Sequence, residues 1–183
     1  MLCLGVPPTP PQPSHAPAPS PPLPPGERVF VALGGNLGDV AAAFDVALEQ
    51  LCTGRDAWLV ARSPVYRTAP VGGVSQPDFL NAVAEIRTSL EPRALLDRLH
   101  AAERSAGRDR AAEVRWGPRP LDLDIILWGS RVSDEPGLTV PHPRFTERLF
   151  VLEPLADLAP GLVPPGHTRT VSQLRDALRT VSG

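Results

Sequence analysis

The sequence contains no lysine, and all 18 of its basic residues are arginine. GC-rich codons are the simplest explanation. The consequence is chemical: phosphate bound by this chain must be held by guanidinium groups, backbone amides or metal ions. The phosphate-binding patterns GxxxxGK[ST] and GxGxxG are also absent, which excludes the commonest nucleotide-binding loops.

Cysteines and long apolar runs are scarce as well. The two cysteines, Cys3 and Cys52, stand in no CxxC or metal-ligand spacing and cannot form a disulfide framework. No apolar run reaches the roughly 20 residues of a membrane-spanning helix. The short apolar start lacks the basic lead of a signal peptide. We therefore expect a cytoplasmic protein with no membrane partner.

Neither sign of charge dominates the chain. The formal net charge is -2, with an isoelectric point near 6.1. A protein whose main task is binding nucleic acid usually has a basic face, so we expect no nucleic-acid partner. A length of 183 residues with 42% hydrophobic content suits one globular domain. Nothing in the sequence requires a second subunit, and we expect a monomer.

Proline is abundant, with 24 residues, and it is concentrated at the start of the chain. Residues 1–26 consist largely of Pro, Ala and Ser, with little to bury. We expect a disordered, extended tail without a catalytic role, followed by one domain over residues 27–183. A segment of this composition is also the type of ligand that SH3 domains bind, although tails and linkers are commoner.

The rest of the chain alternates between strand and helix patterns. Strands are expected over Arg28–Leu33, Trp58–Tyr66, Phe79–Thr88 and Leu121–Trp128. Helices are expected after the cap Asp39, from Pro92 to Gly107, around Glu147–Leu155, and after the capping box of Thr170 and Gln173. This order predicts an α+β fold with a ferredoxin-like antiparallel sheet flanked by helices in three layers, α/β/α.

The fourth expected strand carries two acids, Asp122 and Asp124. Side chains alternate along a strand, so both carboxylates face one side while Leu121, Leu123 and Ile125 face the other. Carboxylates about 6.6 Å apart repel by roughly 2.5 kcal/mol at an effective dielectric constant near 20. Two solvated acids on an exposed face are one interpretation. A divalent cation is the other, and hard oxygen ligands favour magnesium over zinc.

An arginine-rich loop, residues 108–120, leads directly into this acid pair. Arg108, Arg110, Arg115 and Arg119 lie within 12 positions of one another, among Gly and Pro. Guanidinium groups bind phosphate oxygens bidentately, while a metal ion binds the same phosphates. A salt-bridged surface loop is the alternative. The combination with the acid pair indicates a nucleotide polyphosphate site, whereas Gly34–Gly38 is interpreted as a tight strand-to-helix turn.

Five motifs occur in order: VFVALGGNLGD (29–39), YRTAP (66–70), QPDFLNA (76–82), RWGPRPLDLDI (115–125) and VPHPR (140–144). Together they resemble 6-hydroxymethyl-7,8-dihydropterin pyrophosphokinases over essentially all of residues 29–160. The resemblance implies transfer of the diphosphate of ATP to the hydroxymethyl group of the pterin, with release of AMP, in folate biosynthesis. The expected cofactor is Mg²⁺, as two ions, with ATP as co-substrate.

The resemblance also implies roles for individual residues. The metal ligands would be Asp122 and Asp124, and Asp124 is also a candidate proton acceptor. Arg110 and Arg115 would be catalytic, on a loop that closes over the nucleotide. ATP would be bound by Glu103, Arg110, Arg115, Trp116, Arg119, Ile125, His142 and Arg148. The pterin would be bound by Thr68, Val71, Phe79, Asn81, Trp116 and Phe150.

Some positions depart from the family pattern, and two other functions are open. Ala69 stands where proline is common, Phe79 where tyrosine is frequent, and His100 where glutamine is frequent, while the arginine loop is a residue longer than in some members.

One rival function is that of a nucleotidyl- or phosphotransferase that uses the same acid pair on another acceptor. The other is a ferredoxin-like module that binds RNA without catalysis, against which the single tyrosine and the slight acidity count.

Overall fold

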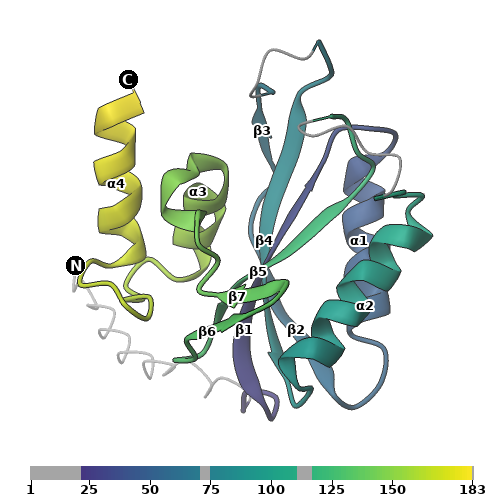
Figure 1. The fold of residues 1–183 in the computed structure, drawn as a ribbon, viewed down its shortest axis with the longest axis horizontal. Coiled ribbons are helices and arrows are strands. Elements are labelled where there is room, and N and C mark those ends of the chain that lie inside the picture. The colour runs from purple at the N-terminus through teal and green to yellow at the C-terminus, as the bar shows by residue number, and fades with distance from the viewer. Residues whose placement is uncertain (1–21, 71–74, 111–116, 183) are drawn as a thin grey trace, which may run out of the picture.

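The computed structural model of the chain describes residues 22–70, 75–110 and 117–182 (Figure 1). These residues form a mixed α+β fold. The strands are β1 (Glu27–Gly35), β2 (Ala57–Arg62), β3 (Tyr66–Thr68), β4 (Phe79–Thr88), β5 (Asp122–Trp128), β6 (Ser133–Glu135) and β7 (Leu138–Val140). The helices are α1 (Val40–Leu51), α2 (Pro92–Ser105), the 3₁₀ turn η1 (Phe145–Glu147), α3 (Leu149–Leu158) and α4 (Val171–Ser182).

The main sheet is antiparallel, with the strand order β2-β4-β1-β5, and β3 pairs with the same strand as β2, namely β4. The register between β1 and β5 shifts between Phe30 and Val31, so that Ile126 is an extra residue on β5. Between Asp122 and Ile125, before this bulge, the side chains of β5 alternate regularly between the two faces. The register places Asp122 opposite Gly34 and Asp124 opposite Ala32.

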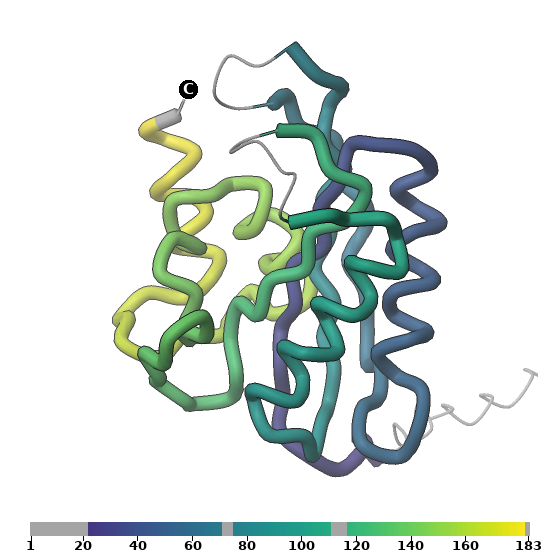
Figure 2. Tube along the Cα trace, turned by 45° about the vertical axis from the view of Figure 1, so that its right-hand side comes forward, coloured from purple at the N-terminus to yellow at the C-terminus, as the bar shows by residue number. Residues whose placement is uncertain are grey.

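Helices cover both faces of the sheet (Figure 1; Figure 2 shows the same layers from another side). One core cluster joins α1 and α2 to side chains such as Val31, Leu33 and Leu123. The other joins α3 and α4 to Phe30, Val83 and other residues of the opposite face. Each strand of the sheet centre therefore buries side chains on both faces. None of the described helices is long and apolar enough to cross a membrane.

Most expected helix boundaries are confirmed by their caps. The Asp39 carboxylate accepts a hydrogen bond from the Ala42 N–H at 3.1 Å, and α1 begins at the next residue. Thr170 and Gln173 bond to each other reciprocally, at 2.9 and 3.3 Å, as a capping box requires. Pro92 opens α2, and Gly107 adopts a positive φ of 88° shortly after its end.

Two expected elements are wrong in extent. The single strand expected over Trp58–Tyr66 is divided, because β2 ends at Arg62 and β3 begins at Tyr66. Between them the buried Ser63 accepts the Val83 N–H with its hydroxyl, and Pro64 has no N–H to offer a ladder. The helix expected to end near Leu155 continues to Leu158, because Pro154 is accommodated inside α3.

The expected tail lies mostly outside the described residues, which begin at residue 22. The first strand starts at Glu27, directly after Gly26. At Gly26 φ is 100°, and a Cβ atom would lie 2.3 Å from the Thr88 carbonyl oxygen, so glycine is required there. The division into a tail and a domain at residue 26 stays a prediction.

Candidate active site

A cavity of about 550 Å³ lies between the sheet and the start of α3. Its wall receives residues from β1, β4, β5, α3 and the loops around them. Of the predicted site residues, nine line it: Thr68, Phe79, Asn81, Arg110, Arg119, Asp122, Asp124, Arg148 and Phe150. Residues far apart in the sequence, both predicted ATP ligands and predicted pterin ligands, thus share one cavity.

The two acids of β5 face this cavity together. Leu121, Leu123 and Ile125 are buried on the other side, as the alternation predicts. Opposite Asp122, Gly34 has no side chain; a Cβ atom there would lie 3.3 Å from the Asn81 Oδ1 atom. The glycine in the middle strand allows the acid on β5 and the amide on β4 to approach from both sides.

Of the two acids, Asp124 has the less favourable electrostatic environment. Burial, and then the neighbouring charge of Asp122, raise its pKa from 3.8 to about 6, while Arg148 acts in the opposite direction. Among the described residues, none donates a hydrogen bond to Asp124. A divalent cation would neutralise both carboxylates, and two hard oxygen donors open to a cavity fit magnesium. The donor set therefore fits the predicted metal.

Asp122 is held by two arginines from the preceding loop. Arg108 Nη1 contacts its Oδ1 atom, and Arg119 Nη1 donates to Oδ2 at 3.0 Å. The Arg108 side chain is only 4% exposed while that of Asp122 is 28% exposed, so the arginine side of this ion pair is shielded from solvent. The arginines fix the orientation of the carboxylate from the side of the loop.

Glu103 on α2 binds two arginines beside the free edge of β5 (Figure 1 shows α2 along this strand). Its side chain is 1% exposed. It accepts hydrogen bonds from Arg108 at 2.5 Å, from Arg110 at 2.7 to 3.0 Å, and from the Leu123 backbone N–H at 2.9 Å. That N–H belongs to the edge strand. Glu103 thereby joins the helix, the arginine loop and the strand that carries the acids.

Asn36, in the turn after β1, fixes the other end of the arginine loop. Its N–H donates to the Arg119 carbonyl and its Oδ1 accepts the Arg119 N–H, both at 2.9 Å. Its amide NH₂ donates to Gln76 and to the Pro77 carbonyl at 3.0 Å. The turn interpreted as a simple connection therefore also positions a cavity arginine. In the sequence, the one indication of this role was the polar residue Asn36 in a turn otherwise made of glycine and leucine.

Polar and aromatic residues form the other wall. Asn81 Nδ2 donates to Thr68 Oγ1 at 2.8 Å, which fixes the orientation of the amide. The guanidinium of Arg119 lies 5.7 Å from the ring centroid of Phe79, and that of Arg148 lies 5.6 Å from that of Phe150. A flat ring with a hydrogen-bonding edge would find aromatic faces and a fixed amide here.

His142 lies beside the cavity rather than on the wall defined above. Its Nδ1 accepts the Arg144 N–H at 3.1 Å, so the neutral ring carries its proton on Nε2. Burial, and then the charge of Arg148, lower its pKa from 6.5 to about 4. The imidazole is neutral at physiological pH and offers a hydrogen-bond donor.

This pKa predicts a pH effect on stability. Between pH 6.5 and 4 the unfolded chain binds a proton at His142 that the folded chain does not, so the free energy of unfolding decreases as the pH falls through this window. Glutamine does not titrate, so we expect His142→Gln to remove the part of that decrease that His142 causes. Because the side chain is partly solvent-exposed, this part is on the order of 1–2 kcal/mol. Urea unfolding at pH 4 and pH 7 checks it; equal pH-dependent losses in both proteins would contradict it.

Other predicted residues lie elsewhere. Ile125 is 5% exposed and packs in the cluster beneath α1 and α2, so the structure does not bring it to the cavity. Glu103 is buried behind the wall. Their predicted contacts with the nucleotide stay predictions. Val71, Arg115 and Trp116 lie outside the described residues.

No individual role was predicted for Asn36 or Arg144, and Arg108 was predicted only as one of four phosphate-binding arginines, although each of the three contacts or lines the site. Arg108 was part of the arginine run that carried the phosphate hypothesis. Arg144 closes the VPHPR motif, and it could have been singled out there as a further guanidinium.

The sequence matches the family model described as 7,8-dihydro-6-hydroxymethylpterin-pyrophosphokinase (HPPK) over residues 30–160. It is similar to two proteins named 2-amino-4-hydroxy-6-hydroxymethyldihydropteridine pyrophosphokinase. The one from Pseudomonas aeruginosa is 48% identical over 142 residues, which are 77% of this chain and 86% of that protein. The one from Methylorubrum extorquens is 46% identical over 142 residues, 77% of this chain and 88% of that protein.

Solved structures share the fold at low sequence identity. An HPPK-DHPS protein in complex with substrates superposes with a TM-score of 0.66 at 11% identity, covering 86% of this chain and 44% of that one. An HPPK-DHPS from Plasmodium falciparum, with pterin and p-hydroxybenzoate, gives 0.65 at 14% identity, covering 87% and 44%. The chain thus spans less than half the length of these solved chains. By its family match and its bacterial relatives, the chain belongs to the 7,8-dihydro-6-hydroxymethylpterin-pyrophosphokinase family.

Proposed function

We propose that this chain transfers the diphosphate of ATP to the hydroxymethyl oxygen of 6-hydroxymethyl-7,8-dihydropterin and releases AMP, as a step in folate biosynthesis. One observation carries the proposal: a carboxylate pair and arginines share a single cavity with aromatic rings and a fixed amide. The first group suits a polyphosphate and the second a flat heterocycle. Membership of a pyrophosphokinase family supports the same reaction.

Asp122 and Asp124 would hold Mg²⁺, with two ions as the expected number. When bound, the metal neutralises charge on the phosphate oxygens. The raised pKa of Asp124 supports this assignment, because a cation would offset both burial and the repulsion from Asp122. Arg108 and Arg119 contact the Asp122 carboxylate and hold its orientation.

The reaction forms a bond between the hydroxymethyl oxygen and the β-phosphorus of ATP. The bond from that phosphorus to the oxygen of the α-phosphate breaks, and its electron pair leaves with AMP. The hydroxyl proton passes to a base, for which Asp124 is one candidate. Arg110, Arg115, Arg119 and Arg148 would offset the charge on the phosphates, as phosphoryl transfer requires. His142 would donate a hydrogen bond from Nε2 to the nucleotide.

The pterin would lie at the opposite end of the cavity. The rings of Phe79 and Phe150, together with Trp116, would flank it. Asn81, Thr68 and Val71 would contact its edge. Because Thr68 Oγ1 accepts from the Asn81 NH₂ group, the Asn81 amide is held in one orientation, which allows it to discriminate between donors and acceptors.

This arrangement predicts a selective loss of pterin binding. We expect Asn81→Ala to raise the KM for the pterin by about ten- to hundredfold, because a buried hydrogen-bonding partner is lost, and to change the KM for ATP less than about threefold. Steady-state kinetics with either substrate varied check it, and the melting temperature controls for folding. Equal increases in both KM values would contradict the assignment.

The proposal also covers the fold type, the oligomeric state, the localisation, the domain bounds and the partners of the chain. The strand order β2-β4-β1-β5, with α1 and α2 packed on one face and α3 and α4 on the other, supports a ferredoxin-like fold in three layers. We also propose a monomeric, cytoplasmic enzyme whose domain spans residues 27–183. The weak net charge supports the expectation that nucleic acid is no partner.

AMP release from Mg-ATP, with and without the pterin, tests the proposal. We expect release that requires the pterin and stops when EDTA removes the metal. AMP release that is equally fast with unrelated alcohol acceptors would instead favour a general diphosphotransferase. No release from a folded sample would contradict the function.

A further inference from the structure

Arg144 lies in the loop between β7 and η1 and lines the same cavity as the acid pair. In the VPHPR motif that contains Arg144, only His142 was predicted to bind the nucleotide. Within the described part of the wall, the charged side chains are four arginines (110, 119, 144 and 148) and two aspartates (122 and 124). The wall therefore has an excess of positive charge, which favours an anionic ligand beyond what the two acids balance.

The arginines from the β5 side bind acids within the protein. Arg110 contacts the buried Glu103, and Arg119 contacts Asp122. Arg144, on the opposite side, donates from Nε to Glu147 at 3.1 Å, in a pair whose side chains are 49% and 61% exposed. An exposed pair of this kind contributes little stability. A phosphate oxygen can therefore replace Glu147 as one partner of Arg144 at little cost.

The neighbours of Arg144 place it on the nucleotide side of the cavity. Its backbone N–H donates to His142 Nδ1. Its charge also repels Arg148, whose pKa is lowered first by burial and then by Arg144, against the opposing attraction of Asp124. Two guanidinium groups that line one cavity and repel one another are stabilised when an anion binds to both.

We propose that Arg144 is a further nucleotide-binding residue whose guanidinium, together with that of Arg148, binds a phosphate group of ATP. The inference rests on the proposed function for the identity of the nucleotide. Its structural alternative is that Arg144 only stabilises the η1 turn through Glu147. The two differ in what the removal of Glu147 does: it removes a competitor of the phosphate in the first case and disrupts the turn in the second.

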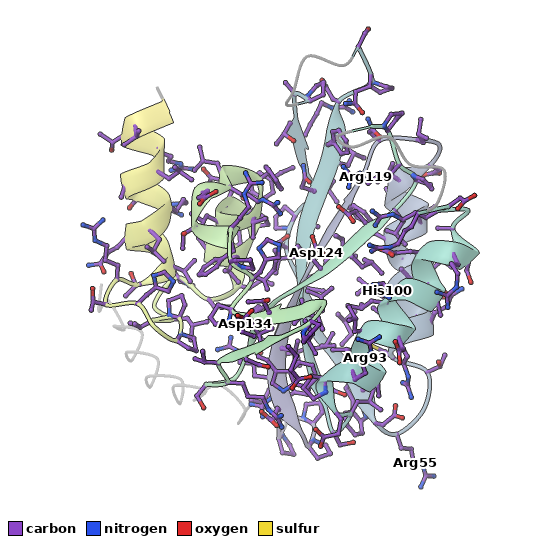
Figure 3. All side chains as sticks on the ribbon, viewed as in Figure 1. Arg55, Arg93, His100, Arg119, Asp124 and Asp134 are labelled. Carbon is purple, nitrogen blue, oxygen red and sulfur yellow. The ribbon has the colours of Figure 1, made fainter. Side chains whose placement is uncertain are left out.

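The test compares three variants in the full chain. Arg144→Gln removes the charge and keeps much of the side-chain length. Glu147→Gln removes only the competing acid. Arg93→Gln is the control, because Arg93 forms a similarly exposed pair with Asp97 on α2, away from Asp124 (Figure 3). The probe is a non-hydrolysable ATP analogue with Mg²⁺, its Kd measured by calorimetry at 50 and 200 mM salt.

We expect Arg144→Gln to raise the Kd about five- to twentyfold and to reduce its salt dependence, as the loss of one charge-assisted contact implies. Glu147→Gln should leave the Kd unchanged or lower it, and Arg93→Gln should leave it unchanged. The KM for the pterin should change in none of them. An unchanged Kd for Arg144→Gln, or equal losses for Arg144→Gln and Glu147→Gln, would overturn the inference.

Failure of the inference and failure of the proposed function are distinguishable. Wild-type protein that binds the analogue but releases no AMP with the pterin would contradict the reaction, while the variants still test Arg144. Normal turnover combined with an unchanged Kd for Arg144→Gln would contradict the inference alone. Melting temperatures, with Arg144→Lys as a second variant expected to retain part of the affinity, separate misfolding from loss of contact.

Discussion

We expect Asp124→Asn to decrease turnover by at least about a thousandfold and to raise the melting temperature of the protein in EDTA. The loss follows because an amide is a poor replacement for a carboxylate ligand of magnesium. The gain follows because folding places this carboxylate in a site that raises its pKa from 3.8 to about 6, through burial and the charge of Asp122. At neutral pH the buried charge therefore costs stability, on the order of 1–3 kcal/mol.

Each kcal/mol corresponds to about 2–4 °C in melting temperature for a chain of this size. Asp134→Asn provides the control, because Asp134 is an exposed acid on β6 that accepts a hydrogen bond from Thr139 at 2.9 Å (Figure 3). It should change neither turnover nor the melting temperature appreciably. Near-normal turnover of Asp124→Asn would refute the metal assignment. A lower melting temperature in EDTA would refute the electrostatic description of the pair.

We expect Glu103→Ala to lower the free energy of unfolding by about 3–5 kcal/mol, the range for removing one partner of a buried ion pair. The substitution leaves the Arg108 guanidinium, 4% exposed, with one carboxylate fewer, and it leaves the Leu123 N–H without its acceptor. Because Arg108 also holds Asp122, turnover should decrease too. Chemical denaturation and kinetics at a temperature where the variant is folded check both effects.

Glu85→Ala is a matched control for this loss. Glu85 also binds an arginine bidentately, but its partner Arg28 is 34% exposed and can be solvated when the acid is removed. We expect a smaller decrease in stability, of about 1–2 kcal/mol, and unchanged turnover. If the two variants lost equal stability and activity, Glu103 would have no special part in positioning the acid pair.

The parts of the site that follow local rules were predictable from the sequence. Alternation along a strand was sufficient to place Asp122 and Asp124 on one face, because no bulge interrupts β5 until Ile126. The caps at Asp39 and Thr170 were readable for the same reason: each depends on hydrogen bonds within three residues. The resemblance to a family, and not periodicity, supplied the substrate and the roles of Thr68, Phe79 and Asn81.

The parts that depend on contacts between distant segments were not predictable. The division of the second strand depends on the Ser63 hydroxyl bonding to Val83. The role of Glu103 depends on α2 lying along the free edge of β5, which places its carboxylate against the Leu123 N–H. Alternation placed Ile125 on the core side of β5, opposite the acids, and the structure confirms that burial. The contact of Ile125 with the nucleotide, which the family resemblance implies, stays a prediction.

Phosphorus NMR of a reaction mixture distinguishes diphosphate transfer to the pterin from other reactions of ATP. The sample contains the purified chain, Mg-ATP and 6-hydroxymethyl-7,8-dihydropterin, with a parallel sample of Asp124→Asn. We expect AMP and a pterin diphosphate to accumulate in equal amounts in the first sample and neither to form in the second. Formation of ADP with a pterin monophosphate, or of AMP with free pyrophosphate, would contradict diphosphate transfer to the pterin.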